Sequence, residues 1–423
     1  MTRSRRKSHQ RARPSSGAGV RVVPVSLIPL DLCNPSQIRG SFGTIARSSV
    51  NFGLPLLPIV EPDTTPASLA VESLVHLTEG WRFLSAALAA SLNNSSSQAI
   101  HFAYYAELRA AISLLSSHGM RVNNRRNTYL NSAGNSTIPP WANRGTHDVV
   151  WALWKDWSAT ATAECLLMDQ LYVLPSVRIR DLKACVSKIS APPTLAQWAL
   201  DLSMGNEHYA RNEASYLASA ARGPISMMLP ADFELVRDLW ALAEPSGFGL
   251  RFEQELARYL VSQAMMDADP NPAVQATWLA GLIADVARDT GCSPASLDAL
   301  FRDATPISPV FNHAFDAATK PINMLARAFF LLRLATLMQK DAHVAHPATV
   351  AKEWLKDWLE HAGLFDRTTG VLPEDKWLDF EHLIRMPTPT LPLPATLHSN
   401  ARQSVDAHLL TRTDAVLAWS TNL

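Results

Sequence analysis

Cysteine and glycine are both scarce in this chain of 423 residues. The cysteines are widely separated and no two of them form a C-x-x-C pair, so neither a disulfide framework nor a zinc ribbon is indicated. They are Cys33, Cys165, Cys185 and Cys292. The presence of only 17 glycines also argues against a tightly cradled phosphate. We therefore expect a protein of the reducing cytoplasm.

The motifs of common enzyme classes are missing as well. The chain has no Walker-type phosphate loop, no G-x-G-x-x-G after a strand, no G-x-S-x-G elbow and no H-E-x-x-H. His343 and His346 have the spacing of two zinc ligands, but they lie in a predicted turn without a second pair of ligands. We expect no cofactor and no bound metal.

Long hydrophobic runs are absent too. The most apolar run, Met324 to Met338, is interrupted by Arg327 and Arg333 and is shorter than the roughly twenty residues that span a bilayer. No apolar segment near the N-terminus has the form of a secretory signal. We predict a buried helix at this run and no membrane partner.

Acidic residues are nearly absent from residues 1–60, which carry nine Lys or Arg against Asp31 alone. The remaining chain has 29 basic and 37 acidic residues. We interpret residues 1–60 as a basic, largely irregular leader with a disordered arm. Such an arm can bind nucleic acid or an acidic partner. Its Arg-rich, acid-poor composition also fits an organellar transit peptide.

The remaining composition is that of a folded protein, with 47% hydrophobic and 18% charged residues. Helical periodicity dominates, and strand-like alternation is limited to residues 20–28 and 171–179. The length exceeds that of one ordinary core. We predict an all-α fold of two packed multi-helix units, residues 61–187 and 194–423, with a Pro-rich connector at 386–396.

The predicted helices follow from this periodicity and from proline at first-turn positions. They cover residues 68–92, 101–119, 146–169, 194–204, 206–221, 230–243, 250–267, 272–290, 294–303, 308–318, 322–341, 347–362, 374–385 and 397–419. His101, Tyr105 and Leu108 share one face of the second helix, and His147, Trp151 and Trp154 share one face of the third. We interpret both faces first as core.

The polar loop at residues 120–145 is the strongest candidate for a binding site. It contains four arginines, several asparagines and a tyrosine, and these groups can contact phosphates and single-stranded bases. The candidate nucleic-acid-binding residues are Arg121, Arg125, Arg126, Arg144 and Tyr129. The alternative is a solvated polar connection.

The string Phe102 to Gly119, with its Tyr104-Tyr105-Ala106 triplet, resembles the aromatic helix of HEPN-type domains. These are small helical bundles found in bacterial toxin and phage-defence systems, and the resemblance covers about residues 98–160. Ribonuclease members carry an Arg, four to six residues and then a His, on a helix at a dimer interface. Arg144 and His147 depart from that spacing, because only two residues separate them.

The spacing does occur at Arg402 and His408, on the predicted last helix, and also at Arg3 and His9 in the leader. The resemblance therefore makes Arg402 and His408 the candidate catalytic pair. His408 would act as general acid or base on a 2′-hydroxyl while Arg402 holds the scissile phosphate.

Three hypotheses about function result. The first is a non-enzymatic binding or regulatory component of a bacterial defence or toxin-type system, which contacts RNA, DNA or a partner protein, or forms a homo-oligomer. The second is a metal-independent ribonuclease that uses Arg402 and His408. The third is a helical scaffold with no small ligand.

Overall fold

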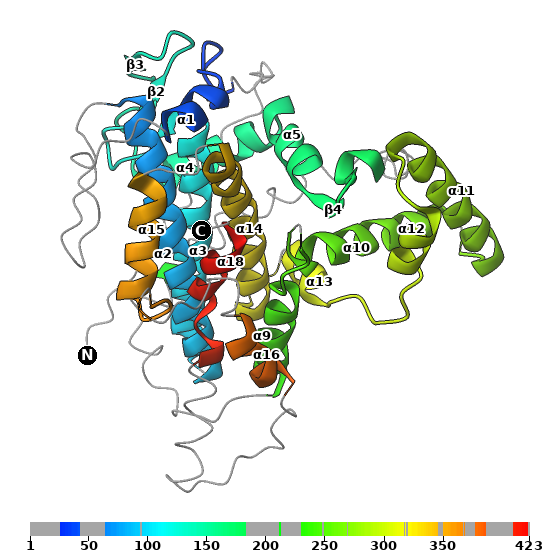
Figure 1. The fold of residues 1–423 in the computed structure, drawn as a ribbon. Helices are drawn as coiled ribbons and strands as arrows, with labels where there is room; N and C mark the ends of the chain where they lie inside the picture. The colour runs from blue at the N-terminus through cyan, green and yellow to red at the C-terminus, as the bar shows by residue number, and fades with distance from the viewer. Residues whose placement is uncertain are drawn as a thin grey trace, which may run out of the picture.

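The fold is all-α with a few short strands (Figure 1). The computed structural model describes residues 26–42, 64–93, 95–182, 211–212, 230–247, 249–268, 270–316, 318, 320–345, 350–366, 368, 377–385 and 409–421. The first helices are α1 (Pro35–Ser41), α2 (Pro66–Leu92), α3 (Ser96–Ser117), α4 (Thr146–Ser158) and α5 (Ala161–Gln170). The later helices are α9 (Pro230–Leu242), α10 (Arg251–Ala268), α11 (Pro272–Thr290), α12 (Pro294–Phe301), α13 (Val310–Phe315), α14 (Pro321–Ala345), α15 (Val350–His361), α16 (Trp377–Ile384) and α18 (Val416–Ser420).

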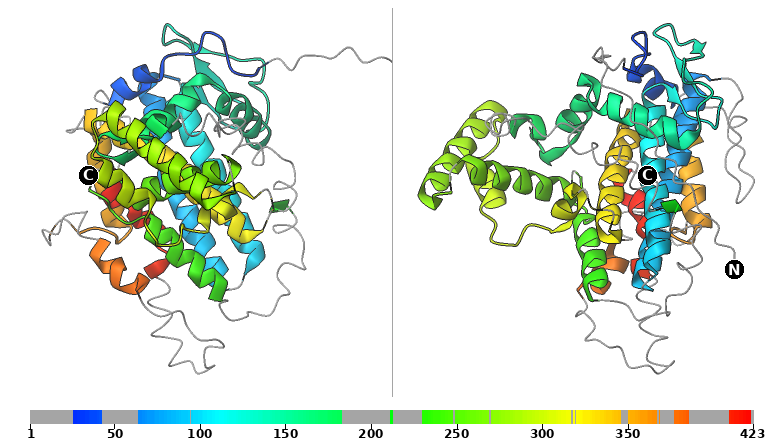
Figure 2. Two further views of the ribbon diagram at one scale, coloured as in Figure 1. Left: turned by 90° about the vertical axis from the view of Figure 1, so that its right-hand side faces the viewer. Right: turned by 180° about the vertical axis from the view of Figure 1, so that it is seen from behind.

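Helices α2, α3 and α14 lie side by side at the centre of the main bundle (Figures 1 and 2). Polar groups fix their alignment within the apolar core. The indole nitrogen of Trp81 on α2 donates to the Thr336 hydroxyl on α14 at 3.1 Å, and the amide of Gln339 donates to the Ser73 hydroxyl at 2.7 Å. A capping box begins α2, because Thr65 and Ser68 each accept from the other's backbone nitrogen.

Helix α14 is the buried helix predicted at the most apolar run. By length and composition alone its residues 321–342 are long and apolar enough to cross a membrane, but 89% of the apolar window is buried inside the protein. Core helices pass the same test. Burial on all sides explains why the sequence of α14 is apolar around its whole circumference.

The main bundle draws on both of the expected domains. We expected a division near residues 187–194, yet α14 from the C-terminal part packs directly on α2 and α3 from the N-terminal part. Helices α10, α11 and α12 instead project from the bundle as an arm (Figures 1 and 2). Residues 188–194 themselves lie outside the described part of the chain.

Two arginines of α14 enter the core with carboxylate partners. Arg327 contacts Glu107 of α3 at 3.1 Å, and Arg333 contacts Glu253 of α10 at 2.6 Å. All four side chains are at most 3% exposed. Removing one member of such a pair leaves an uncompensated buried charge. These pairs therefore hold α14 in one position against α3 and α10.

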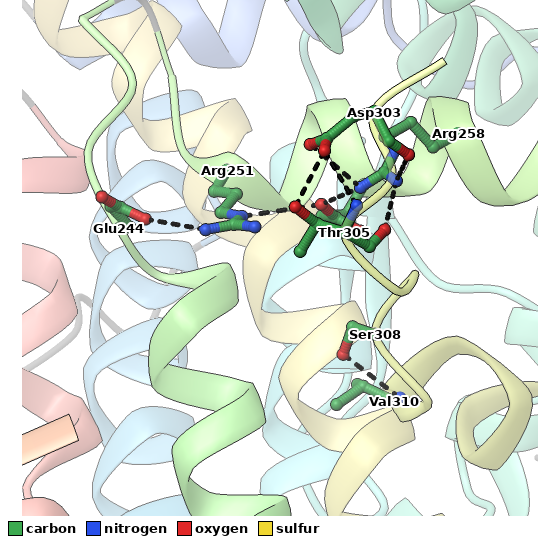
Figure 3. Close-up of polar contacts among 8 residues, drawn as sticks. Glu244, Arg251, Arg258, Asp303, Thr305, Ser308 and Val310 are labelled. Atoms are coloured by element: carbon green, nitrogen blue, oxygen red, sulfur yellow. Dashed lines mark hydrogen bonds and ion pairs between the residues drawn. The ribbon is translucent and has the colours of Figure 1, made fainter. Parts of the chain in front are cut away.

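A third buried arginine fixes the segment between α12 and α13 (Figure 3). The Arg258 guanidinium contacts the Glu255 carboxylate at 2.7 Å and donates to the carbonyl oxygens of Asp303 and Thr305 at 2.8 and 2.5 Å. Thr305 in turn donates its backbone nitrogen and its hydroxyl to the Asp303 carboxylate. These contacts fix residues 303–305 to α10, so we assign the cluster a structural role.

Residues 26–42 are the described part of the predicted leader. They contain α1, whose Ile38 is 1% exposed, and their first part is held against residues 119–156. We call Ser26–Cys33 the N-terminal strap. Gly119 permits its close approach, since its φ is +88° and a Cβ there would lie 2.5 Å from the Cys33 sulfur. Residues 1–25 and 43–60 lie outside the described residues.

Other predicted elements differ in detail. The helix expected at 146–169 is two helices, α4 and α5, because Thr160 caps a new start by accepting from the backbone nitrogen of Ala163. The last helix is interrupted before the 3₁₀ turn Thr413–Ala415 and α18. The strand-like run at 171–179 is confirmed as a hairpin of β4 (Tyr172–Leu174) and β5 (Val177–Arg178). The helix predicted at 194–204, most of that at 206–221 and the 386–396 connector fall outside the described residues.

Replacing one buried arginine tests the role of the α14 ion pairs. We expect Arg333→Ala to lower the free energy of unfolding by about 3–5 kcal/mol, because Glu253 is left charged and buried. The double variant Arg333→Met with Glu253→Gln should recover at least half of that loss, since its glutamine can still accept from the Leu250 backbone nitrogen, as Glu253 does. Chemical denaturation measures both. Equal stability of the single and double variants would contradict this role.

His118 predicts an acid dependence of stability. Burial lowers its pKa from 6.5 to about 4, although its Nδ1 donates to the Leu114 carbonyl at 2.7 Å. Between pH 6.5 and 4 the unfolded chain binds a proton that the folded chain does not, so the free energy of unfolding should fall by about 3 kcal/mol across this window. Denaturant unfolding at several pH values should show the decrease in the native protein and a smaller one in His118→Asn, whose amide can still donate to Leu114. An equal decrease in the free energy of unfolding in the native protein and in His118→Asn would show that His118 does not cause the pH dependence.

Candidate nucleic-acid interface

The polar loop between α3 and α4 folds into a small antiparallel sheet, which the sequence did not predict. Its strands are β1 (Met120–Arg121), β2 (Thr128–Leu130) and β3 (Ser136–Thr137), in that order. The turn at residues 122–127 ends at the buried Asn127, whose side chain contacts the segment 138–145.

Asn127 organises the loop around its side chain. Its amide nitrogen donates to the carbonyl oxygens of Trp141, Ala142 and Arg144 at 3.0 to 3.3 Å, and its side-chain oxygen accepts from the backbone nitrogen of Asn123 at 2.9 Å. Both halves of the loop are thereby fixed to each other. The arginines of each half consequently lie on a defined surface.

Three of the five predicted binding residues are exposed on this surface. Arg125, Arg126 and Arg144 are brought together by the bond from the Arg125 backbone nitrogen to the Arg144 carbonyl, at 3.3 Å. Arg125 adopts a left-handed conformation, with φ of 64°, which is uncommon for a residue with a side chain. Within the described part of the chain, no carboxylate forms an ion pair with any of the three. We call these three residues the basic rim.

The basic rim lies beside the start of α4, because Arg144 directly precedes its N-cap. Gly145 is the N-cap of this helix and provides no side-chain cap, so the positive end of the helix dipole adds to the guanidinium charges. Asp148 in the first turn is exposed and opposes them. The backbone nitrogens of Asn124, Arg125 and Arg126 all donate within the protein, so an anion here would be bound mainly by side chains.

Arg121 and Tyr129 correct the predicted site. Arg121 is 6% exposed, and its guanidinium contacts the Glu72 carboxylate at 2.6 Å. Its charge is therefore paired inside the fold. Tyr129 is 8% exposed and donates its hydroxyl to Asp31 of the N-terminal strap at 2.9 Å. Neither side chain is available to a ligand on the surface.

The N-terminal strap attaches beside the basic rim. The Leu27 backbone nitrogen donates to Asp156 at 2.6 Å, and its carbonyl accepts from the indole nitrogen of Trp141 at 3.0 Å. The Trp141 carbonyl oxygen in turn accepts a hydrogen bond from the backbone nitrogen of Arg144 at 3.1 Å. The strap directly follows positions 1–25, which include seven basic residues.

A cluster of tyrosines, histidines and one arginine continues from the rim. His147 contacts the Tyr104 hydroxyl through Nδ1 at 2.9 Å and an amino group of Arg211 through Nε2 at 3.2 Å. Because arginine only donates, Nε2 accepts, and the proton of the neutral ring is on Nδ1. Arg211 also donates to the Tyr105 hydroxyl at 2.8 Å, and its guanidinium lies 5.4 Å from the centre of that ring.

The titratable groups of this cluster favour a single positive charge on Arg211. Burial and the charge of Arg211 lower the pKa of His101. Burial raises the pKa of Tyr104 to about 12. Both groups are therefore neutral near pH 7. The Arg211 guanidinium therefore lies among neutral His101 and Tyr104 side chains.

Arg211 was not predicted, because neither its spacing nor its local composition links it to residues 101–147. His147 and Tyr105 were expected in the core, yet both are only partly buried, and Tyr104 is the fully buried tyrosine of this cluster. The candidate catalytic residues Arg402 and His408 lie outside the described residues. The described residues contain no group of three or more His, Cys, Asp or Glu side chains that could bind a metal.

Comparisons of the chain with known proteins identify no relative. Neither the protein-family models nor the curated proteins nor the solved structures contain a match to the chain.

Proposed function

We propose that this protein binds nucleic acid through the basic rim and the basic segment attached beside it. The observation that carries the proposal is the convergence of Arg125, Arg126 and Arg144 on one surface, without a carboxylate partner among the described residues. Exposed arginines of this kind bind phosphates, because a guanidinium group can donate two parallel hydrogen bonds to one phosphate.

The described architecture supports binding more than catalysis. The buried charges at Glu107, Glu253 and Arg258 are used to join helices, and the cluster around Arg211 has neutral histidine and tyrosine neighbours. A role in a defence or toxin-type system remains a proposal that rests on the resemblance of residues 98–160 to HEPN-type domains. A protein partner at the same surface is the alternative, and it would have to be acidic.

Charge reversal at the rim provides the direct test. We expect Arg125→Glu with Arg126→Glu to weaken binding of a labelled RNA or single-stranded DNA at low salt by ten-fold or more. The slope of log K against log salt concentration should also become shallower by about one to two units, because fewer counterions are released. Fluorescence anisotropy across a salt series measures both quantities.

Two controls separate a site from a general charge effect. Arg288→Glu on α11 with Arg302→Glu at the C-cap of α12 makes the same change of net charge on the arm and should leave binding nearly unchanged. Asp148→Asn removes the carboxylate beside the rim and should strengthen binding. Absence of binding by the native protein, or equal losses in both double variants, would refute the proposal. RNA that is cleaved, and is no longer cleaved by Arg402→Ala and His408→Ala variants, would favour the ribonuclease instead.

The basic segment makes a separate prediction. A chain that begins at Ser26 keeps the strap contacts of Leu27 and lacks the seven basic residues before it. We expect weaker binding and a shallower salt slope than in the full chain, additive with the loss in the Arg125 and Arg126 variant. An unchanged salt slope in the shortened chain would limit the interface to the basic rim.

A further inference from the structure

An aromatic row lies next to the basic rim, on α2 and α3. Phe83, His101, Phe102 and Tyr105 are each partly exposed, although aromatic side chains of this size can be buried completely elsewhere in the same bundle. Their ring centres are 5.0 to 6.4 Å apart, and the rings of Phe83 and Tyr105 are stacked at 5.3 Å. The four rings, with interplanar angles of 25 to 81°, form one contiguous, partly exposed platform.

The row is continuous with the basic rim through His147. Its ring lies 6.0 Å from that of Tyr105, and it is three residues beyond Arg144 on the first turn of α4. Cations also border the platform. Arg211 lies over Tyr105, and the exposed Arg82 precedes Phe83 on α2. Glu79, the nearest acid on α2, forms an ion pair with Arg109, whose Nε lies 2.9 Å from the Glu79 carboxylate.

We propose that the ligand of the basic rim is a single-stranded nucleic acid whose bases stack on the row Phe83, His101, Phe102 and Tyr105. This inference rests on the proposed function and adds the class of substrate to it. Phosphates contact Arg125, Arg126 and Arg144, while the neighbouring bases lie against the rings. Stacking on aromatic side chains requires unpaired bases and tolerates any sequence, because every base has a flat face.

The inference predicts a preference that phosphate binding alone does not produce. A duplex has a higher charge density than a single strand, so a surface that recognises only phosphates binds the duplex at least as tightly. We expect the full-length protein to bind a mixed-sequence single strand about ten-fold more tightly than its duplex. It should also bind the base-containing strand more tightly than an abasic strand of the same length. Equal binding of the base-containing and abasic strands would overturn the inference.

A pair of conservative variants tests the residues themselves. Phe83→Leu with Phe102→Leu removes two rings but keeps apolar side chains, and we expect about ten-fold weaker binding of the single strand with unchanged binding of the abasic strand. Phe301→Leu with Phe315→Leu removes two partly buried rings, one on α12 and one on α13, and serves as the matched control. Thermal unfolding of each variant checks that it folds, and the strand comparison in the native protein decides the question if one does not.

The outcomes separate this inference from the proposed function. Loss of binding in the Arg125 and Arg126 variant, together with unchanged binding in the Phe83 and Phe102 variant, would leave a phosphate-binding surface and refute base stacking. Tighter binding of the duplex than of the single strand would have the same meaning. Native protein that binds none of the oligonucleotides would refute both.

Discussion

The position of α14 depends on two guanidinium groups that are buried with their carboxylates. Arg327 and Arg333 are six residues apart on this helix and reach Glu107 on α3 and Glu253 on α10 respectively. Apolar packing alone would allow a helix that is hydrophobic on all sides to rotate or slide. A displaced α14 would leave charges in the core without partners, at a cost of several kcal/mol each. The ion pairs therefore select one register.

This constraint extends to the candidate site through α3. Helix α3 packs between α2 and α14, and almost all of its residues from Ala106 onward are buried. Its earlier turns carry the partly exposed His101, Phe102 and Tyr105, and its end leads into the sheet of the polar loop. The rigid helix thus sets both the aromatic row and the origin of the loop. Within the loop, the side chain of Asn127 and the backbone bond from Arg125 to Arg144 bring the arginines of the two halves together.

Arginine has different roles in the interior and on the surface of this protein. Arg121, Arg258, Arg327 and Arg333 each have a carboxylate partner and connect secondary-structure elements. Arg125, Arg126 and Arg144 have none among the described residues and face solvent. Their positive charge is free to act on a ligand, and the helix dipole of α4 increases it.

The sequence by itself determined the helical class, most helix boundaries and the burial of α14, because hydrophobic periodicity and proline at first turns are local signals. It also located the loop that contains the basic rim. It could not distinguish the buried Arg121 from the exposed Arg125, since the partner Glu72 is 49 positions away in the chain. Only the tertiary structure placed Arg211 against Tyr105 and His147, the strap beside Trp141 and α14 among the N-terminal helices. These contacts depend on the packing of distant segments, which no local pattern encodes.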